Sequence, residues 1–414
     1  MRRYRSTRIG DVPLFVLVVA LAVFGILMIY SAGVVDVPNK ITAGAWRNQV
    51  TWFALSMLVI PVVMRVPVAW IEWAAQPAYA FCIVLLVLTL FIGGGGEGVA
   101  ASEKSWIRVG PVTIQTSELA KIGVVLMLSR VLGEWREPPS TLWALWKPVA
   151  VVMFPMALVL LQPDLGTGLV FTSILIWALF WAGTPLVTLF FLVSPVLSLF
   201  LSINTIVWGV YVVLLLAVLF FRRSAFLSEK VTIFLLNVVA GVVALPLWQH
   251  LKPYQKNRLL VFLDPSVDPR GSGYNLIQSR VAIGSGGWLG KGFTMGTQKR
   301  LAFIPEQHTD FIFSVVGEEL GFIGVLAVLL VFGLIFWRLV KIAERSSDPF
   351  ASMVPFGLFG SWFAHVLVNV GMTVGIMPIT GIPLPFVSYG GSFLLVNLLA
   401  MAIVQRIAAE TGRG

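Results

Sequence analysis

Long apolar runs, separated by short polar segments, extend along almost the whole chain. A membrane-spanning helix needs roughly 17–25 mostly apolar residues. Runs that approach this length lie at 12–33, 48–65, 73–92, 117–133, 146–162, 165–182, 184–202, 204–221, 231–250, 311–340, 352–376 and 386–407. The pattern therefore predicts an all-α polytopic membrane protein with about 10–12 transmembrane helices in a single membrane domain, residues 1–414.

Basic residues at the ends of the runs predict the orientation of the chain. Loops rich in Lys and Arg stay in the cytoplasm, and the segment 1–8 before the first run is basic. Because this run is longer than the roughly 7–15 apolar residues of a signal peptide, we expect it to be retained. The loops that alternate to the same side all carry Lys or Arg, namely Arg130/Arg136/Lys147, Arg222/Arg223/Lys230, Arg338/Lys341/Arg345 and Arg406/Arg413. Both termini are thus predicted to be cytoplasmic, and residues 251–310 to form a large extracytoplasmic loop.

Composition supports a lipid environment and excludes several function classes. The chain is 58% hydrophobic and 12% charged, whereas soluble domains carry about 25% charged residues. The net charge of +10 does not indicate nucleic acid, because the cations cluster at the ends of apolar runs. A single cysteine, Cys82, and three widely spaced histidines predict no transition-metal site. No cofactor is evident, and the sequence leaves open a requirement for a divalent cation such as Mg²⁺ or Mn²⁺.

The loop at 251–310 is basic although it is predicted to lie outside. Its cations are Lys252, Lys256, Arg258, Arg270, Arg280, Lys291, Lys299 and Arg300. This charge suggests an anionic ligand, although long loops partly escape the charge rule. The apolar spacing of 274–283 predicts an amphipathic helix at the membrane surface. The glycine-rich segment 284–292 can turn tightly and point N–H groups at an anion, but glycine-rich linkers are also common.

Ionisable residues inside or at the ends of the runs are candidates for chemistry, because charge is costly in a membrane. Asp310 precedes the run at 311–340, where it either favours the positive end of a helix or acts as a general base. Glu118 and Lys121 are three residues apart, so they can pair on one helix face and share a cavity with Asp310. Asp164 lies in a turn, where helix capping is the simpler interpretation.

Three further features surround these candidates. Glu318 and Glu319 lie two turns into the span that follows Asp310, and they are expected to face the protein interior. Trp106 is either an interfacial anchor or a platform for a sugar. The stretch 375–392 is rich in Gly and Pro and contains Ser388. It predicts non-helical backbone that forms a wall of the site, since such backbone needs protein or a polar cavity around it.

These motifs together resemble the SEDS family, the RodA/FtsW membrane glycosyltransferases of bacterial cell-wall synthesis. The matching segments cover nearly the whole chain and are Ser117-Glu118-Leu119-Ala120-Lys121, Gln162-Pro163-Asp164-Leu165-Gly166-Thr167, 264–293, 305–313 and 378–392. The segment 278–292 looks more like RodA than FtsW. The chain has Thr116 where the family usually has Pro, and Ser105 where it commonly has Arg, a charge that Lys104 can supply. Compared with the family, 184–250 is expected to hold extra helices.

The resemblance implies a peptidoglycan glycosyltransferase that polymerises lipid II, an undecaprenyl-diphosphate-linked disaccharide peptide, into β-1,4 glycan during cell elongation. Asp310 then matches the essential aspartate of an inverting enzyme. The residues that bind substrate or support the site are Glu118, Lys121, Asp164, Trp106, Arg258, Arg270, Arg280, Lys291, His308 and Ser388. The implied partner is a class B penicillin-binding protein, a transpeptidase, and the implied location is the bacterial cytoplasmic (inner) membrane, with an extracytoplasmic active site. A precursor flippase or transporter and a non-catalytic scaffold are the alternatives.

Overall fold

The computed structural model describes residues 9–36, 44–94, 105–110, 112–135, 137–139, 141–221, 226–250, 256–257, 260–262, 264, 267–268, 272–301, 303–304 and 306–411. The long helices are α1 (Val12–Gly33), α3 (Ala45–Val63), α4 (Val68–Ile92), α5 (Thr116–Gly133), α6 (Trp146–Leu161), α7 (Leu165–Trp181), α8 (Leu186–Leu201), α9 (Thr205–Phe221), α10 (Leu227–His250), α14 (Ile312–Arg345), α15 (Pro349–Val374) and α16 (Gly391–Thr411). The smaller elements are β1 (Trp106–Val109), β2 (Val112–Gln115), η2 (Trp143–Leu145), α12 (Ser272–Gly286) and α13 (Thr297–Arg300).

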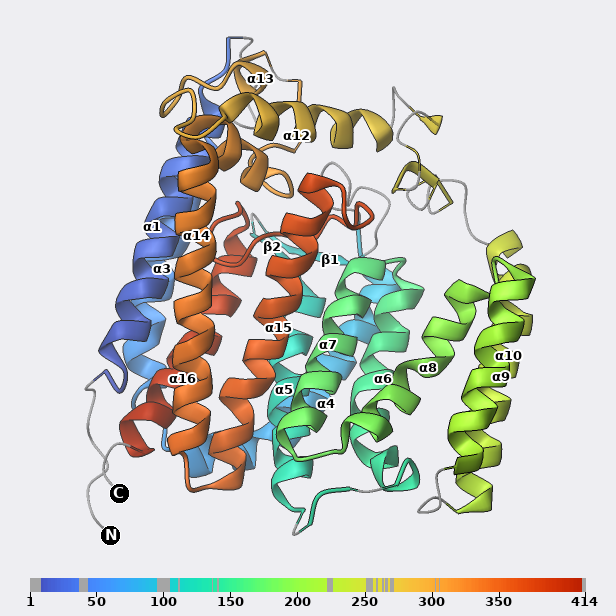
Figure 1. Ribbon diagram of the computed structural model, residues 1–414. Coiled ribbons are helices and arrows are strands. Elements are labelled where there is room, and N and C mark those ends of the chain that lie inside the picture. The colour runs from blue at the N-terminus through green and yellow to red at the C-terminus, as the bar shows by residue number, and fades with distance from the viewer. Residues whose placement is uncertain are drawn as a thin grey trace, which may run out of the picture.

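Every predicted span coincides with a long helix among these residues (Figure 1). In the part of the chain that the structure describes, 7 helices are long and apolar enough to cross a membrane, and α7, α8 and α9 are shorter apolar helices. The remaining two, α3 and α5, carry more polar side chains, and those of α5 belong to the site described below. The prediction of an all-α, multi-pass membrane fold is therefore confirmed.

Helix α15 lies at the centre of the bundle, where it packs against α5, α7 and α14 (Figure 1). Its apolar and small residues are buried around most of its circumference. A helix that is apolar on all sides is stable only when neighbours cover it completely. Helix α16 packs against α3 and is buried to a similar extent. The polar residues on these central helices must therefore find partners inside the protein.

Helices α8, α9 and α10 lie together at one side of the bundle (Figure 1). The Asn237 amide on α10 donates to Ser194 Oγ on α8 at 2.8 Å, and Trp208 Nε1 on α9 donates to Ser198 Oγ at 2.8 Å. Hydrogen bonds of this kind between buried side chains hold helices together in a membrane. The segment 184–250, which we expect to contain the extra helices, corresponds to this three-helix group.

The two ends of the bundle differ in structure. At one end the start of α1 meets the end of α16, where the Asp11 N–H donates to Gln405 Oε1 at 2.8 Å and Arg338 forms an ion pair with Asp11. At the opposite end α12 lies across the bundle (Figure 1). There Ser279 Oγ donates to the Thr373 carbonyl at 2.7 Å. The helix predicted at 274–283 is thus confirmed, and the end that it covers is called the α12 end below.

Helix α14 is interrupted at Gly321, whose φ of 63° and ψ of −164° are not helical. The glycine-rich segment fills the interruption, since the Phe322 N–H donates to the Gly287 carbonyl at 2.9 Å and the Lys291 N–H donates to the Glu318 carbonyl at 3.0 Å. Backbone groups released by a broken helix need such partners at membrane depth. The expectation that this segment points its N–H groups at an anion is therefore wrong for Lys291, because a helix carbonyl accepts that bond.

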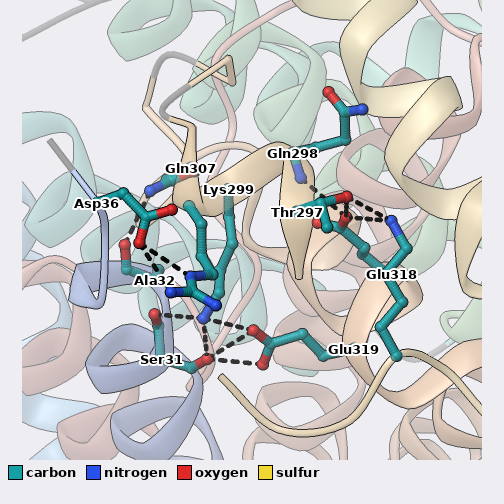
Figure 2. A network of polar contacts seen from close by, with 11 residues as sticks. Ser31, Ala32, Asp36, Thr297, Gln298, Lys299, Gln307, Glu318 and Glu319 are labelled. Atoms are coloured by element: carbon teal, nitrogen blue, oxygen red, sulfur yellow. Dashed lines mark hydrogen bonds and ion pairs between the residues drawn. The ribbon is translucent and has the colours of Figure 1, made fainter. Parts of the chain in front are cut away.

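Buried ion pairs fasten the α12–α13 region to α1 and α14 (Figure 2). Lys299 Nζ lies 2.5 Å from Glu319 Oε1, and it also donates to the Ser31 carbonyl at 2.6 Å. Lys291 Nζ forms a second pair with Glu318 Oε1 at 2.8 Å. Both glutamate side chains are 0% exposed, so the prediction that they face the protein interior is confirmed. Each carboxylate has a cation because an unpaired buried charge is strongly destabilising.

Candidate active site

A cavity of about 560 Å³ lies beneath the α12 end, between α3, the β1–β2 pair and the segments that lead into α5, α7, α14 and α16. Cavities that bind small molecules typically have volumes of roughly 300–1,000 Å³. The acidic, basic and histidine side chains in its lining are Arg108, Glu118, Asp164, Glu306, Asp310 and His365. Four of the candidates predicted from the sequence, Trp106, Glu118, Asp164 and Asp310, therefore line one cavity although they are distant in the chain.

Asp310 lies in the turn just before α14, and its side chain lines the cavity with 8% of its surface exposed. Two buried side chains fix this turn. Asn369 Nδ2 on α15 donates to the carbonyls of Asp310 and Ile382, at 2.8 and 2.7 Å. Ser388 Oγ donates to the Thr309 carbonyl at 2.7 Å. The non-helical stretch that contains Ser388 thus forms a wall of the cavity, as its breaker-rich sequence predicts, and the Ser388 hydroxyl holds the backbone next to Asp310.

Glu118 and Lys121 form the predicted ion pair, with 2.8 Å between Lys121 Nζ and Glu118 Oε1. Both side chains are almost completely buried. A histidine on α15 joins them, because His365 Nε2 lies 2.6 Å from Lys121 Nζ. Glu118 and His365 line the cavity, whereas Lys121 lies behind them. The pairing prediction is confirmed, and the third member was missed by the sequence analysis.

Asp164 both caps a helix and lines the cavity. It is the N-cap of α7, because Asp164 Oδ1 accepts the Thr167 N–H at 2.8 Å and Oδ2 accepts the Thr167 hydroxyl at 2.7 Å. Its carboxylate also lines the cavity, where Gln115 Nε2 donates to it at 3.4 Å. Capping therefore fixes the orientation of a carboxylate that faces the cavity.

The β1–β2 pair contributes an aromatic and a cationic side chain. Trp106 and Arg108 are two residues apart on β1, so they lie on the same face of the strand, and both line the cavity. Trp106 Nε1 has no hydrogen-bond partner among the described residues. Arg108 is the one Lys or Arg in the described lining. We did not single it out from the sequence, and Lys104, which we did, lies outside the described residues.

None of the predicted loop cations that the structure describes lines this cavity. Arg258 and Arg270 lie outside the described residues, and neither Arg280 nor Lys291 is part of the lining. Three of the loop cations form ion pairs with carboxylates of the chain itself, namely Lys291 with Glu318, Lys299 with Glu319 and Arg300 with Asp36. The positive charge of the loop therefore reflects, in part, the two buried acids of α14 and the exposed Asp36 that follows α1.

His308 packs against Tyr389 and is not itself part of the cavity lining. Its ring lies 5.3 Å from that of Tyr389 and is 3% exposed. Neither ring nitrogen has a hydrogen-bond partner in the described part of the chain. Burial lowers the pKa of His308 to about 4, so the ring is neutral near pH 7. Over the described ranges no cluster of three or more His, Cys, Asp or Glu side chains is arranged to hold a metal ion.

The fold and this cavity define a class: a multi-pass membrane protein with carboxylates, an aromatic ring and a guanidinium around a cavity at one end of its bundle. The family of cell cycle proteins that comprises FtsW, RodA and SpoVE matches residues 12–213 and 205–413. The chain belongs to this family, and the SEDS resemblance inferred from its motifs is confirmed.

Individual relatives align with this chain over nearly its full length. The peptidoglycan glycosyltransferase RodA of Treponema pallidum is 35% identical over 436 residues, which cover 99% of each chain. A probable peptidoglycan glycosyltransferase FtsW of Trichlorobacter lovleyi is 34% identical, over 96% of this chain and 93% of that protein. A solved structure of a peptidoglycan synthase complex, which coordinates polymerisation and crosslinking, contains a chain that superposes with a TM-score of 0.70 at 29% identity, covering 98% of this chain and 99% of that one.

Proposed function

We propose that the chain is a peptidoglycan glycosyltransferase that polymerises lipid II into β-1,4 glycan strands. Relatives over its full length are peptidoglycan glycosyltransferases. The observation that carries the proposal is the position of Asp310, a carboxylate in the lining of a cavity of about 560 Å³ that also presents an aromatic ring and a guanidinium. A sugar needs an aromatic surface and polar groups, and a diphosphate needs a cation, so this lining suits a lipid-linked sugar.

Asp310 is the proposed general base. Its carboxylate takes the proton from the 4-hydroxyl of the acceptor sugar as that oxygen forms a bond to the anomeric carbon of the donor. The bond from this carbon to the diphosphate breaks, undecaprenyl diphosphate leaves with the electron pair, and the configuration inverts. A base fixed in the right position accelerates such a step by about 10²–10⁴-fold. The Asn369 and Ser388 contacts supply this fixation, because they hold the backbone beside the carboxylate.

Cations near the leaving group stabilise the charge that the diphosphate gains. Arg108 is the candidate that lines the cavity. Arg258, Arg270 and Arg280 remain proposed contacts of the diphosphate. Lys291 is less suited to that role, because its ammonium pairs with Glu318.

We further propose that the chain acts in the RodA branch, in cell elongation, with a class B penicillin-binding protein that cross-links the glycan. A similar chain in a peptidoglycan synthase complex supports such a partner. RodA-named and FtsW-named relatives are almost equally similar to this chain, so the branch assignment rests on the sequence of 278–292.

The proposed orientation places both termini in the cytoplasm and the α12 end outside. Basic residues of the end opposite α12, such as Lys341 and Arg345, support it through the positive-inside rule. Cysteines introduced at residue 270, in a chain without Cys82, test it. Labelling by an impermeant reagent in intact cells is expected, and labelling only after the membrane is opened would contradict this topology.

Purified protein and purified lipid II test the proposed activity. Wild-type protein, alone or with its partner, is expected to form glycan strands, whereas Asp310→Ala is not. Movement of lipid II across vesicle membranes without polymerisation would favour the flippase alternative. A chain that neither polymerises nor moves lipid II, with or without a partner, would favour the scaffold.

A further inference from the structure

We propose that His365 is a positioning residue of the active site, which holds the Lys121 ammonium against Glu118 and connects this pair to the non-helical wall at 381–383. This inference rests on the proposed function for its consequences in catalysis. Its structural part concerns the contacts alone and can be tested separately.

The first observation is the enclosure of Lys121. The residue is 5% exposed, and its ammonium has three N–H donors and no acceptor. One donor bonds to Glu118 at 2.8 Å and a second points to His365 Nε2 at 2.6 Å. The ammonium also lies 5.7 Å from the centre of the Phe393 ring, within the range of a cation–π contact. A buried ammonium is tolerated only with such partners, and His365 is one of them.

The second observation fixes the hydrogen-bonding state of the imidazole. Because the ammonium can only donate, His365 Nε2 must accept, and the ring proton must lie on Nδ1. Nδ1 lies 2.9 Å from the Pro383 carbonyl, which can only accept. The neutral imidazole on α15 therefore accepts a hydrogen bond from Lys121 on α5 and donates one to the wall of the cavity at Pro383.

The third observation places this bridge at the cavity. Glu118, His365 and Pro383 all belong to the lining. The hydrogen bonds through Lys121 and His365 couple their positions, so a shift of the imidazole changes the place of the Glu118 carboxylate and of the wall together. A misplacement of about 1 Å in groups that orient a substrate can reduce a reaction rate roughly 100-fold.

Two substitutions separate the hydrogen bonds from the packing. His365→Phe keeps a ring of similar size but removes both polar contacts, whereas His365→Gln keeps an acceptor for Lys121 and a donor for Pro383. We expect His365→Phe to reduce the rate of lipid II polymerisation by about 10–100-fold. His365→Gln is expected to regain at least about tenfold over the Phe variant. The matched control is Thr373→Val on the same helix, whose hydroxyl bonds to its own helix at Val370 and whose loss should leave the rate unchanged.

A double-mutant cycle tests whether His365 acts through the ion pair. In the background Glu118→Gln/Lys121→Met the charges are absent, so adding His365→Phe is expected to lower the apparent melting temperature much less than it does in the wild-type background. This cycle needs no activity. Wild-type protein that fails to polymerise lipid II would refute the proposed function and leave the cycle as the test of the inference. Equal effects of His365→Phe in both backgrounds, or equal activity of the Gln and Phe variants, would overturn it.

Discussion

The buried pair between Lys299 and Glu319 gives a quantitative prediction about how the α12–α13 region is held. Lys299→Met removes the cation and leaves the Glu319 carboxylate, which is 0% exposed, with Ser31 as its remaining partner in Figure 2. Burial lowers the pKa of Lys299, and the hydrogen bond and the charge of Glu319 act in the opposite direction. The lysine therefore depends on Glu319 to remain charged, and the carboxylate depends on the lysine.

The expected loss is large for a single substitution. Breaking a buried pair by removing one partner costs about 3–5 kcal/mol, and replacing both partners with apolar side chains costs far less. The double variant Lys299→Met/Glu319→Met should therefore be more stable than Lys299→Met. Arg300→Met is the matched control on the same short helix, because the pair between Arg300 and Asp36 is 41% and 50% exposed. An exposed pair contributes only about 0–1 kcal/mol.

The single cysteine provides the assay. Cys82 is buried at 7% exposure, so a thiol-reactive dye reports unfolding as the detergent-solubilised protein is heated. Lys299→Met should unfold several degrees below the wild type, and Arg300→Met close to it. If Lys299→Met were as stable as Arg300→Met, or the double variant less stable than Lys299→Met, the reasoning about this pair would be refuted.

Three further predictions use thermal unfolding, followed by the same dye at neutral pH and by intrinsic tryptophan fluorescence where the pH is varied. Exchanging the charges, as Glu118→Lys/Lys121→Glu, should restore stability compared with either single substitution, and additive losses would show that the two residues act separately. Because the pKa of His308 falls from 6.5 to about 4 on folding, the unfolded chain binds more protons between these values, and stability should be lost as the pH falls from 6.5 towards 4. At pH 5 the loss of stability is about 2 kcal/mol. His308→Phe should make stability depend less on pH in this range. An unchanged dependence on pH would contradict its assignment to His308. Gly321→Ala places a Cβ 2.3 Å from a backbone nitrogen of the glycine-rich segment at a φ of 63°, so it should be clearly destabilising, whereas Gly333→Ala, with open space around it, should not be.

The spans could be predicted because the bilayer imposes their length and polarity on the sequence. The lipid environment also explains why Asp310, Glu118 and Asp164 could be identified as candidates. An ionisable side chain in or near a membrane span is energetically costly and therefore usually has a structural or catalytic role. Their meeting in one cavity required the fold, because contacts such as that of Lys121 with His365 join α5 to α15.

The missed residues and the internal pairing of several loop cations have physical reasons. His365 and Asn369 lie in an apolar helix, where local sequence shows a buried polar group but not its partner. Arg108 was overlooked because a strand of four residues between two spans carries no strong pattern. The cations of the 251–310 loop suggested an external anion, since their number is visible in the sequence. Sequence alone could not show that Lys291 and its neighbours face the chain's own carboxylates.

The base assignment of Asp310 is the central claim, and the rate of lipid II polymerisation by Asp310→Asn tests it most directly. Asparagine keeps the size of the side chain and much of its hydrogen bonding but cannot accept the proton. The purified variant should retain its melting temperature and its binding of lipid II, and it should polymerise at least about 100-fold more slowly than the wild type. A near-normal rate in Asp310→Asn would contradict the account and leave Glu118 as the next carboxylate to test.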